Sequence, residues 1–475
     1  MKFQRGATPT KARVRRWPIL GEGPLRRGCL PIVVAVMVAV VDMADPQEGL
    51  ASAFFIREQS ASAMGSAFAG ATAGADDPTS MFFNGAALGR QSGNSVAVVG
   101  SSVLSQASFR NGAARTFTGV PIAGNDGGDA GGFAAIPATY GAWDVSRDLG
   151  WTQDVRLGVA VNGPFGFETA YRDDWIGRYY AVQSQLRTIN VNPLIAWIPF
   201  EGLSVAFGLQ AQHVDAKLTN AIDFGSLGAA NGVPGAIPGG QDGFGRLTGD
   251  DWGFGWTMGL LIEPAAGTRL GIGYRSHIRH ELEGDARLRL DDAGMGAALG
   301  QSAGTRAAKA NLTLPEIVSL GLHQQLDENW SIMAEAAWTR WSRYRVLRVQ
   351  FENPDLPEEY SEEDWRDTWF LAGGASFRLD PAWTLRCGVA WDQSPVPSRT
   401  RTPRTPANSG IMLGLGVGWQ PLSNVSLAAA FTHFFIESAR INLESSSPGN
   451  AGRGDLSGSS RTSVDAFAVQ LVWGF

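Results

Sequence analysis

The side chains that most often carry acid–base, nucleophilic or metal chemistry are sparse in this sequence. The histidines are His213, His277, His280, His323 and His433. A hydrolytic enzyme needs a nucleophile held beside a base, and no G-x-S-x-G motif pairs with these histidines. His277 and His280 lie beside Glu281, but in a β-strand a spacing of three places two side chains on opposite faces, which does not suit chelation. The sequence therefore predicts no enzyme, no metal site and no cofactor.

The N-terminal region has the three parts of a secretory signal. Basic residues between Lys2 and Arg27 precede an apolar run, residues 30–41, and residues 51–53 form an A-x-A cleavage site. We expect residues 1–53 to be removed as a signal peptide. The alternative is a retained anchor helix, but the acidic residues after the apolar run favour cleavage. Cleavage removes Cys29 and leaves Cys387 without a disulfide partner.

Composition narrows the class of protein. The chain has 475 residues, with 60 glycines and 16 tryptophans. Its mean hydropathy of -0.07 is too polar for a bundle of membrane helices, which need runs of about 20 apolar residues each. The formal net charge of -6 becomes more negative without the basic leader, which argues against nucleic acid as a partner. Abundant glycine and aromatic residues at moderate hydropathy are typical of a transmembrane β-barrel, whose residues face lipid and lumen alternately.

Apolar residues recur with a period of two in many segments. Between Trp383 and Trp391, for example, Leu385, Cys387 and Val389 alternate with polar or small residues. This period predicts strands with one apolar face. The strands are about twice as long as those of soluble sheets, enough to cross a membrane when tilted. About fourteen such segments are found, and they begin near Ser95, Gly132, Gln153, Arg187, Leu203, Asp251, Thr268, Pro315, Trp330, Arg366, Trp383, Gly410, Asn424 and Thr462.

The connections alternate between short and long. Residues 200–201 and 380–382 are short joins, whereas residues 218–249 and 285–314 are long polar loops. Short periplasmic turns that alternate with long outer loops are the usual strand connections of an outer-membrane barrel. An open sheet edge would leave backbone groups unsatisfied in hydrocarbon, so the sheet must close. The sequence therefore predicts an all-β fold, an antiparallel transmembrane β-barrel of about 14 strands that is integral to the bacterial outer membrane and is expected to be a monomer surrounded by outer-membrane lipid.

Aromatic residues mark the end of the chain and the ends of strands. Phe467, Trp473 and Phe475 fall on one face of the last segment. Outer-membrane barrels generally end this way, and we expect these three residues to be the signal that the barrel assembly machinery reads. Tryptophans near strand ends are expected to form girdles at the two membrane surfaces: Trp175, Trp197, Trp341, Trp369, Trp383 and Trp419.

Residues 54–93 precede the predicted barrel, residues 94–475, and show neither a strand period nor a helix period. They are rich in serine, alanine and glycine. Ahead of a wide barrel, such a segment is either a periplasmic tail or a plug in the lumen. Small residues suit a plug, because its backbone can pack closely against glycines such as Gly414 and Gly416 on the inner wall. A plug disfavours the alternative of a general diffusion porin, which needs none.

Several stretches are similar to one family. They are residues 74–78 with 83–88, 162–166 with 174–179, 314–316 with 338–342, 391–397 with 401–404, and 438–442. They extend from the plug to near the end of the chain and resemble the FadL-type outer-membrane transporters of long-chain fatty acids. The Asp-Gln-Ser-Pro-Val-Pro stretch is the most specific. Gly85 departs from the family, which usually has proline there, and makes this turn less rigid. The resemblance implies a 14-stranded barrel, closed by an N-terminal hatch, that takes up hydrophobic molecules without ATP.

The resemblance also implies where the cargo binds. The family's outer groove corresponds to residues 218–249 and 285–314, where Leu227, Met295 and Leu299 are candidates and simple loop packing is the alternative for each. The segment that lines the family's inner pocket is similar to Phe54, Phe55 and Ile56. A buried carboxylate needs a cationic or hydrogen-bonding partner, and the candidates for this role are Arg178, Lys217, Arg386 and Arg399.

A kinked third strand is the candidate exit. Its residues are Asn162, Gly163, Pro164 and Phe165. Proline gives no ladder donor and glycine tolerates a bend. The resemblance implies that the kink faces the hatch turn formed by Asn84, Gly85 and Ala86; the alternative is that Gly163-Pro164 merely ends the strand. The cargo stays open, because fatty acids, aromatic hydrocarbons and other apolar molecules all use barrels of this family, and a barrel lipase is a more distant alternative.

Overall fold

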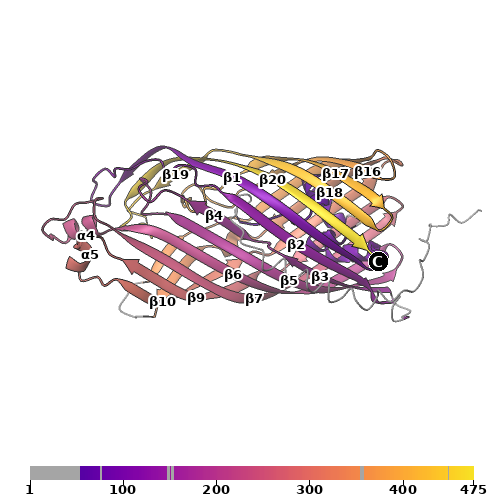
Figure 1. Ribbon diagram of the computed structural model, residues 1–475, viewed down its shortest axis with the longest axis horizontal. Helices are drawn as coiled ribbons and strands as arrows, with labels where there is room; N and C mark the ends of the chain where they lie inside the picture. Colours follow the sequence, from indigo (N-terminus) through magenta and orange to yellow (C-terminus); the bar gives the residue numbers. More distant parts are fainter. Residues whose placement is uncertain (1–53, 75–76, 147–149, 151–153, 353–357, 448) are drawn as a thin grey trace, which may run out of the picture.

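In the computed structural model, residues 54–475 are described except 75–76, 147–149, 151–153, 353–357 and 448, so the predicted signal peptide lies outside the described residues. The strands form one closed antiparallel barrel of 14 spans, which confirms the predicted fold (Figure 1). Pairing of the first strand with the last closes the barrel.

Interrupted spans carry two strand labels. In chain order the spans are β1 (Ser95–Arg115); β2 (Phe133–Asp144); β3 (Asp154–Asn162) with β4 (Gly166–Ala170); β5 (Gln183–Phe200); β6 (Leu203–Asp223); β7 (Asp242–Ala265); β8 (Thr268–Arg275) with β9 (Ile278–Arg289); β10 (Gly304–Leu314) with β11 (Ile317–Gln325); β12 (Trp330–Thr339) with β13 (Val346–Phe351); β14 (Glu359–Glu362) with β15 (Thr368–Arg378); β16 (Trp383–Asp392); β17 (Gly410–Leu422); β18 (Val425–Ile436) with β19 (Ala439–Leu443); and β20 (Asp455–Gly474).

The alternation in the sequence becomes the two faces of the wall. The outward side chains of Trp197, Trp369, Trp383 and Trp419 are all well exposed, as aromatic girdles require. Trp383 pairs with Trp419 near the short-turn end, and their rings stack with centroids 5.5 Å apart. The girdle prediction is wrong for two residues. Trp175 and Trp341 are buried, because both lie outside the strands, where the chain turns its side chains inward.

Several spans extend further past the membrane than the sequence indicated. The loop between β6 and β7 is residues 224–241 rather than 218–249, and the loop between β9 and β10 is residues 290–303 rather than 285–314. Both outer loops are therefore shorter than predicted. Beyond the hydrocarbon layer the outer face of the wall is wet, so the apolar alternation ends there while backbone pairing continues.

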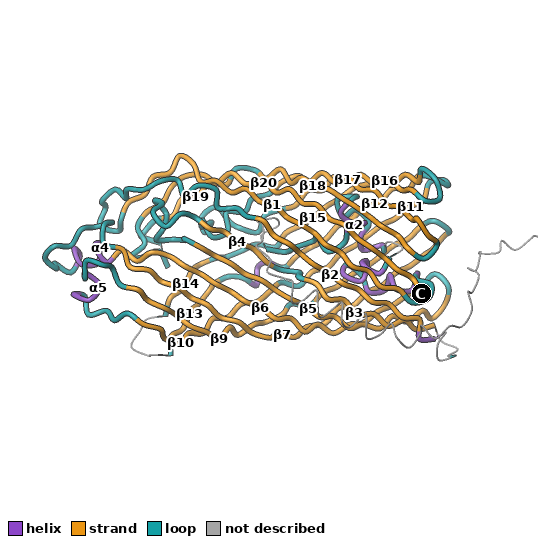
Figure 2. The backbone as a smooth tube through the Cα atoms, in the orientation of Figure 1, coloured by secondary structure: helices purple, strands orange, loops and turns teal. Residues whose placement is uncertain are grey.

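The segment before β1 lies inside the barrel, as the plug prediction requires (Figure 2). It contains α2 (Ala61–Met64) and the 3₁₀ helices η2 (Ala71–Ala73), η3 (Pro78–Phe82) and η4 (Gly85–Arg90). Ser60, Asp77 and Asn84 begin three of these helices, each accepting a hydrogen bond from a backbone amide two or three residues later. We call this segment, from Phe54 to Arg90, the hatch. No helix in the described part of the chain is long and apolar enough to cross a membrane.

Glycines of the wall let the hatch backbone approach closely. A Cβ atom added at Gly388 would lie 1.9 Å from the carbonyl oxygen of Ser66, and one at Gly416 would lie 2.6 Å from Cα of Gly65. No other residue fits these positions without displacing the hatch. The glycine-rich inner face therefore serves to seat the hatch.

Deletion of Phe475 is expected to reduce insertion into the outer membrane. The amide of Phe475 donates to the carbonyl of Asn94 at 2.9 Å, and its ring packs 5.1 Å from that of Trp473. The deletion thus removes a bond and an aromatic contact from the strand that closes the barrel. Immunoblots of membrane and periplasmic fractions would measure the loss. Phe475→Tyr, which keeps the ring, should assemble normally; normal assembly of the truncated chain, with its heat-dependent gel shift, would contradict the prediction.

Candidate transport pathway

The ladder between β2 and the third span is incomplete. β2 pairs with β3 only from Thr139 to Asp144, and residues 133–138 pair with β1 alone. The continuation of the third span, β4, pairs with β5 alone. Extending the β2–β3 register would place Gly163 opposite Pro137 and Pro164 opposite Ile136. A proline on each strand therefore lacks the amide that a continued ladder would use.

A bulge in the third span accompanies this break. Asn162 pairs with Asn190 and Gly166 with Arg187, so the third span holds one more residue than β5 over this stretch. The hydroxyl of Thr188 accepts from the amide of Phe165 at 2.9 Å and donates to its carbonyl at 2.6 Å. A side chain thus replaces the backbone ladder at the bulge, and Gly163-Pro164 interrupts the third span rather than ending it.

The N-terminal end of the hatch occupies the break. The amide of Ile56 donates to the carbonyl of Pro164 at 2.9 Å, and the amide of Gly166 donates to the carbonyl of Phe54 at 2.8 Å. Together these bonds form an isolated antiparallel bridge between Phe55 and Phe165. The sequence indicated two separate sites, the segment of Phe54 to Ile56 and the kink, and the structure brings them together.

The hatch turn lies elsewhere, so it does not face the break as expected. The Asn84 amide group donates to the carbonyl of Thr72 at 2.8 Å and to that of Leu260 in β7 at 3.0 Å. A Cβ atom on Gly85 would lie 3.2 Å from the Cβ of Ala206 in β6. Asn84, Gly85 and Ala86 therefore hold the hatch against the inner faces of β6 and β7.

Asn84→Ala is expected to loosen the hatch and raise leakage of small polar solutes. The substitution leaves two carbonyls and the amide of Ala86 without their partner, at about 1–3 kcal/mol for each buried group. Asn84→Asp is the matched control, since it retains an acceptor for Ala86 but no donor for the wall. Sensitivity of cells to a bulky polar antibiotic would report leakage. Equal sensitivity of both variants and wild type would overturn the prediction.

Aromatic rings surround Phe54 on the inner side of the break. Its ring centroid lies 4.7 Å from that of Trp341, 5.1 Å from that of Trp365 and 5.8 Å from that of Phe167. Tyr344 adds a ring at 6.0 Å. Trp341, Trp365 and Tyr344 were not among the binding residues predicted from the sequence. The only available signal was the density of aromatic residues between β12 and β15.

An apolar cavity of about 80 Å³ adjoins this cluster. Phe54, Phe167 and Tyr344 line one side of it. Polar residues in the lining are few, chiefly Gln185 and Thr248; Lys309 also borders the cavity, but its side chain is 70% exposed and pairs with Glu283 at 2.5 Å. The aliphatic lining consists of Leu186, Ala216, Leu218, Leu247, Leu282, Ala308, Ala310, Leu312, Leu347 and Val349. An apolar molecule would fit such a lining without an unpaired polar group.

One acidic group lies beside the aromatic cluster, above the membrane. Burial raises the pKa of the Glu363 carboxyl to about 7. The indole of Trp365 donates to this carboxyl at 3.2 Å and Ser361 donates at 3.0 Å. These bonds fix the orientation of Trp365 toward the cluster.

The outer-loop candidates lie on two short helices at the far end of the barrel from the short turns. Leu227 is in α4 (Phe224–Ala230), and Met295 begins α5 (Met295–Ala298), which Leu299 follows. The two helices meet, because a Cβ atom on Gly228 would lie 2.4 Å from the sulfur of Met295 (Figure 1). Met295 is thus packed between the loops, whereas Leu227 and Leu299 remain partly exposed.

The predicted carboxylate partners do not line the cavity. Arg178 is buried in an outer loop, where it pairs with Asp242 at 2.6 Å and donates to three backbone carbonyls. Lys217 shares the outward face of β6 with exposed Leu209. Arg399 pairs with Asp364, and Arg386 lies at the short-turn end. None of the four is placed to hold a head group in the apolar cavity.

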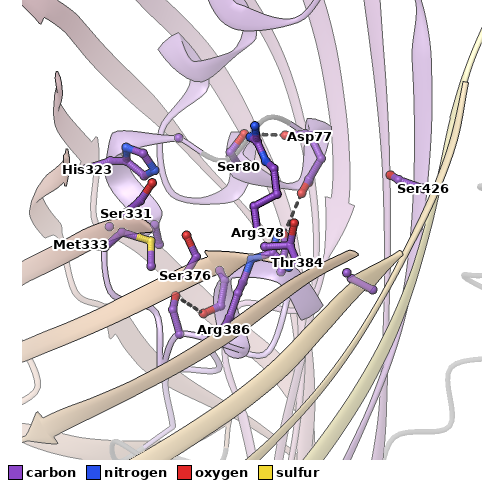
Figure 3. Close-up of a pocket in the computed structure, with 18 of the residues that line it drawn as sticks. Asp77, Ser80, His323, Ser331, Met333, Ser376, Arg378, Thr384, Arg386 and Ser426 are labelled. Carbon is purple, nitrogen blue, oxygen red and sulfur yellow. Dashed lines mark hydrogen bonds between the residues drawn. The ribbon is translucent and has the colours of Figure 1, made fainter. Parts of the chain in front are cut away.

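A second cavity of about 800 Å³ lies between the hatch and the short turns (Figure 3). Its lining is polar. Asp77 and Ser80 come from the hatch, and Arg378, Thr384 and Arg386 come from the wall. Apolar cargo that passed straight down the lumen would have to cross this polar space.

Metal ligands do not converge in the described residues, and one string that matches a nucleophile motif lies outside the usual setting of that motif. No group of three or more histidine, cysteine or acidic side chains there could hold a metal ion. Residues 300–304 match the pattern G-x-S-x-G, but this string is an exposed loop that ends at the first residue of β10. A nucleophile elbow instead follows a strand and begins a helix.

A closed, hatched barrel with an apolar cavity beside a break in its wall defines a class of outer-membrane transporter. Residues 45–475 match the family model described as outer membrane protein transport protein (OMPP1/FadL/TodX). The chain belongs to this family of outer-membrane transporters of hydrophobic compounds.

The chain aligns with several known proteins over most of their length. The chain is 26% identical over 429 residues to a long-chain fatty acid transport protein of Escherichia coli O6:H1, covering 84% of this chain and 90% of that protein. It is 28% identical over 450 residues to a putative outer membrane protein of Neisseria meningitidis serogroup B, covering 90% and 95%. In fold it is similar to a FadL homologue of Pseudomonas aeruginosa, with a TM-score of 0.81 at 23% identity over 89% of this chain and all of the other. It is also similar to the toluene transporter TbuX of Ralstonia pickettii, with a TM-score of 0.60 at 19% identity over 90% and 99%.

Proposed function

We propose that the protein carries long-chain fatty acids passively across the outer membrane. Cargo is captured at the outer loops, binds in the apolar cavity, and leaves sideways through the break in the third span. The observation that carries this proposal is the double position of Phe54. Its carbonyl accepts a hydrogen bond from the amide of Gly166 on the β4 side of the break, while its ring lines the apolar cavity. A molecule that displaces this ring therefore pulls on the segment that fills the exit.

The polar lower cavity supports sideways release. Passing an alkyl chain from an apolar site into a polar, wet space costs about 0.8 kcal/mol for each methylene exposed. An exit in the wall delivers the chain to hydrocarbon and avoids this cost. The break in the third span is such an exit once residues 54–56 move away.

Two classes of cargo fit the inner site. The relatives named as long-chain fatty acid transport proteins and the mainly aliphatic cavity support a fatty acid. A monoaromatic hydrocarbon is the second candidate, because the rings around Phe54 offer edge-to-face contacts to another ring.

Narrowing the apolar cavity is expected to abolish binding of the true cargo. Ala310 faces the cavity from β10, so Ala310→Trp fills it with an indole. Ala307→Trp is the matched control, because Ala307 is exposed on the same strand. Binding of radiolabelled palmitate and toluene to detergent-purified protein would be measured side by side. Loss of palmitate binding by the Ala310 variant alone supports the proposal; toluene bound and palmitate refused by wild type would select the second candidate.

A further inference from the structure

A row of four side chains, three of them aromatic, marks the upper edge of the apolar belt on one side of the barrel. Tyr274, Val318, Trp338 and Trp369 are paired neighbours on four adjoining spans. Trp369 is exposed, and Leu320, two residues below Val318, is also exposed on the same outward face. Such a row lies where hydrocarbon meets the head groups.

Directly above this row, all the spans from the seventh to the tenth are interrupted. The breaks fall at residues 276–277, 315–316, 340–345 and 363–367. Glu316 and Arg340 continue the outward face of their strands two residues above Val318 and Trp338, and the amide of Arg340 donates to the carbonyl of Glu316 at 3.0 Å. Two strand residues rise about 7 Å, which is the depth of the head-group layer.

Two guanidinium groups are held side by side at this level. Arg340 donates to Glu316 Oε1 at 3.0 Å, and Arg343 donates to the same atom at 3.0 Å and also to Oε2. The Glu316 side chain is only 7% exposed, but those of Arg340 and Arg343 are 48% and 30% exposed. His277 lies 3.7 Å from Glu316 and is itself 45% exposed. The carboxylate is thus covered by two guanidinium groups that face outward, with the imidazole of His277 beside them.

The cluster has more positive charge than its carboxylate neutralises. Two arginines share one glutamate. On the next span the exposed Arg366 is followed by Asp367, whose carboxylate accepts from the amide of Ser342 at 3.0 Å, so three arginines face two carboxylates and one positive charge remains. Each guanidinium has five donors in a planar fork, and Glu316 uses only one from Arg340 and two from Arg343. Forked donors with an excess positive charge match the geometry of phosphate.

We propose that Glu316, Arg340 and Arg343 form a binding site on the outer wall for the phosphate of a phosphorylated glycolipid of the outer leaflet. The acyl chains of this lipid lie along the belt below Trp338 and Trp369, and its phosphate meets both guanidinium groups. Such a lipid covers the interrupted part of the wall from outside. This inference stands apart from the proposed function, because it concerns the lipid-facing surface and not the lumen.

Lipid binding by purified protein tests the site. Delipidated protein in detergent is incubated with bis-phosphorylated lipid A and examined by native mass spectrometry. Arg340→Gln with Arg343→Gln should weaken binding by about tenfold or more, because two charge-assisted contacts are lost. The matched control is Arg287→Gln with Arg348→Gln, which removes two exposed arginines from β9 and β13 higher on the same wall. This pair should bind as wild type does.

Three further measurements make the outcome decisive. Adding Glu316→Gln to the double variant keeps a neutral hydrogen-bonded cluster, and the heat-dependent gel shift shows that the chain is folded. Weak binding by this folded triple variant supports the site, whereas wild-type binding overturns it. Binding of dephosphorylated lipid A as tightly as the phosphorylated form also overturns it. Displacement of the lipid by millimolar inorganic phosphate would show a free-phosphate site instead and overturn the glycolipid assignment.

Discussion

Removing the bulge in the third span is expected to stop uptake while cargo still binds to the protein. The variant replaces Gly163-Pro164 by a single valine and adds Pro137→Val. With one residue removed, the third span has the same number of residues as β5 over this stretch, so the bulge disappears. The two valines supply amides that allow the ladder to β2 to continue. A continuous ladder leaves no exit in the wall. Uptake of labelled palmitate by cells should fall to the level of cells without the transporter.

A proline elsewhere in the wall supplies the control for this experiment. Pro193 lies in β5, opposite Val159, where the ladder to β3 is intact. Pro193→Val should therefore leave uptake unchanged. The heat-dependent gel shift must show that both variants are folded. Wild-type uptake by the folded, straightened variant would rule out the sideways route, and loss of palmitate binding along with uptake would show that the variant had damaged the cavity rather than the exit.

A reversible cross-link between the hatch and the break is expected to switch uptake off and on. Phe55 and Phe165 form an antiparallel bridge whose flanking bonds run from Ile56 to Pro164 and from Gly166 to Phe54. This makes them a non-hydrogen-bonded pair, with Cα atoms about 4.5 Å apart, within the range of a disulfide. The variant combines Phe55→Cys and Phe165→Cys with Cys387→Ser. The oxidised protein should not release cargo, and reductant should restore uptake.

The single-cysteine variants control for the loss of each ring. Each should transport with and without reductant, although the lost aromatic contact with Phe54 or Phe82 weakens binding somewhat. Electrophoresis after trypsin digestion would confirm the disulfide. Equal uptake by the oxidised and reduced double variant would mean that the hatch end does not have to leave the break.

The membrane-spanning part of the fold could be predicted because hydrocarbon imposes a period of two on the wall. That constraint ends at the head groups. The start of β7 was placed at Asp251, whereas the strand begins at Asp242, because residues such as Thr248 and Asp250 belong to a wall that is wet outside. Parity also separates neighbouring tryptophans. Trp341 lies three positions after the outward-facing Trp338, which is the opposite face of the strand, so at the start of the 3₁₀ turn η5 (Trp341–Arg343) it is buried instead of joining the girdle.

The candidate site could be predicted only where a residue type has a local meaning. Gly163-Pro164 indicated a break because of backbone chemistry, and Pro137 inside the alternating segment of β2 gave the same signal but was missed. Cationic partners have no such local signature. β6 extends to Asp223, so Lys217 lies on the strand and faces the same outward side as Leu209. This alternation alone excludes Lys217 as a carboxylate partner in the lumen. Arg178 forms an ion pair with Asp242, which lies far away in the sequence, so no local sequence pattern predicts the pair.

The height of the wall above the membrane determines how surface polysaccharide affects uptake. From the aromatic residue Trp256, β7 continues back to Asp242, and at about 3.4 Å per residue and a tilt of about 40° this stretch rises roughly 35 Å above the hydrocarbon. The helices α4 and α5 therefore stand at the tips of a rigid sleeve, not on the membrane surface. Saccharide chains shorter than the sleeve leave its mouth open to nutrients in the medium, whereas longer chains bury it. Surface glycan length then becomes a control on uptake that requires no change in the transporter.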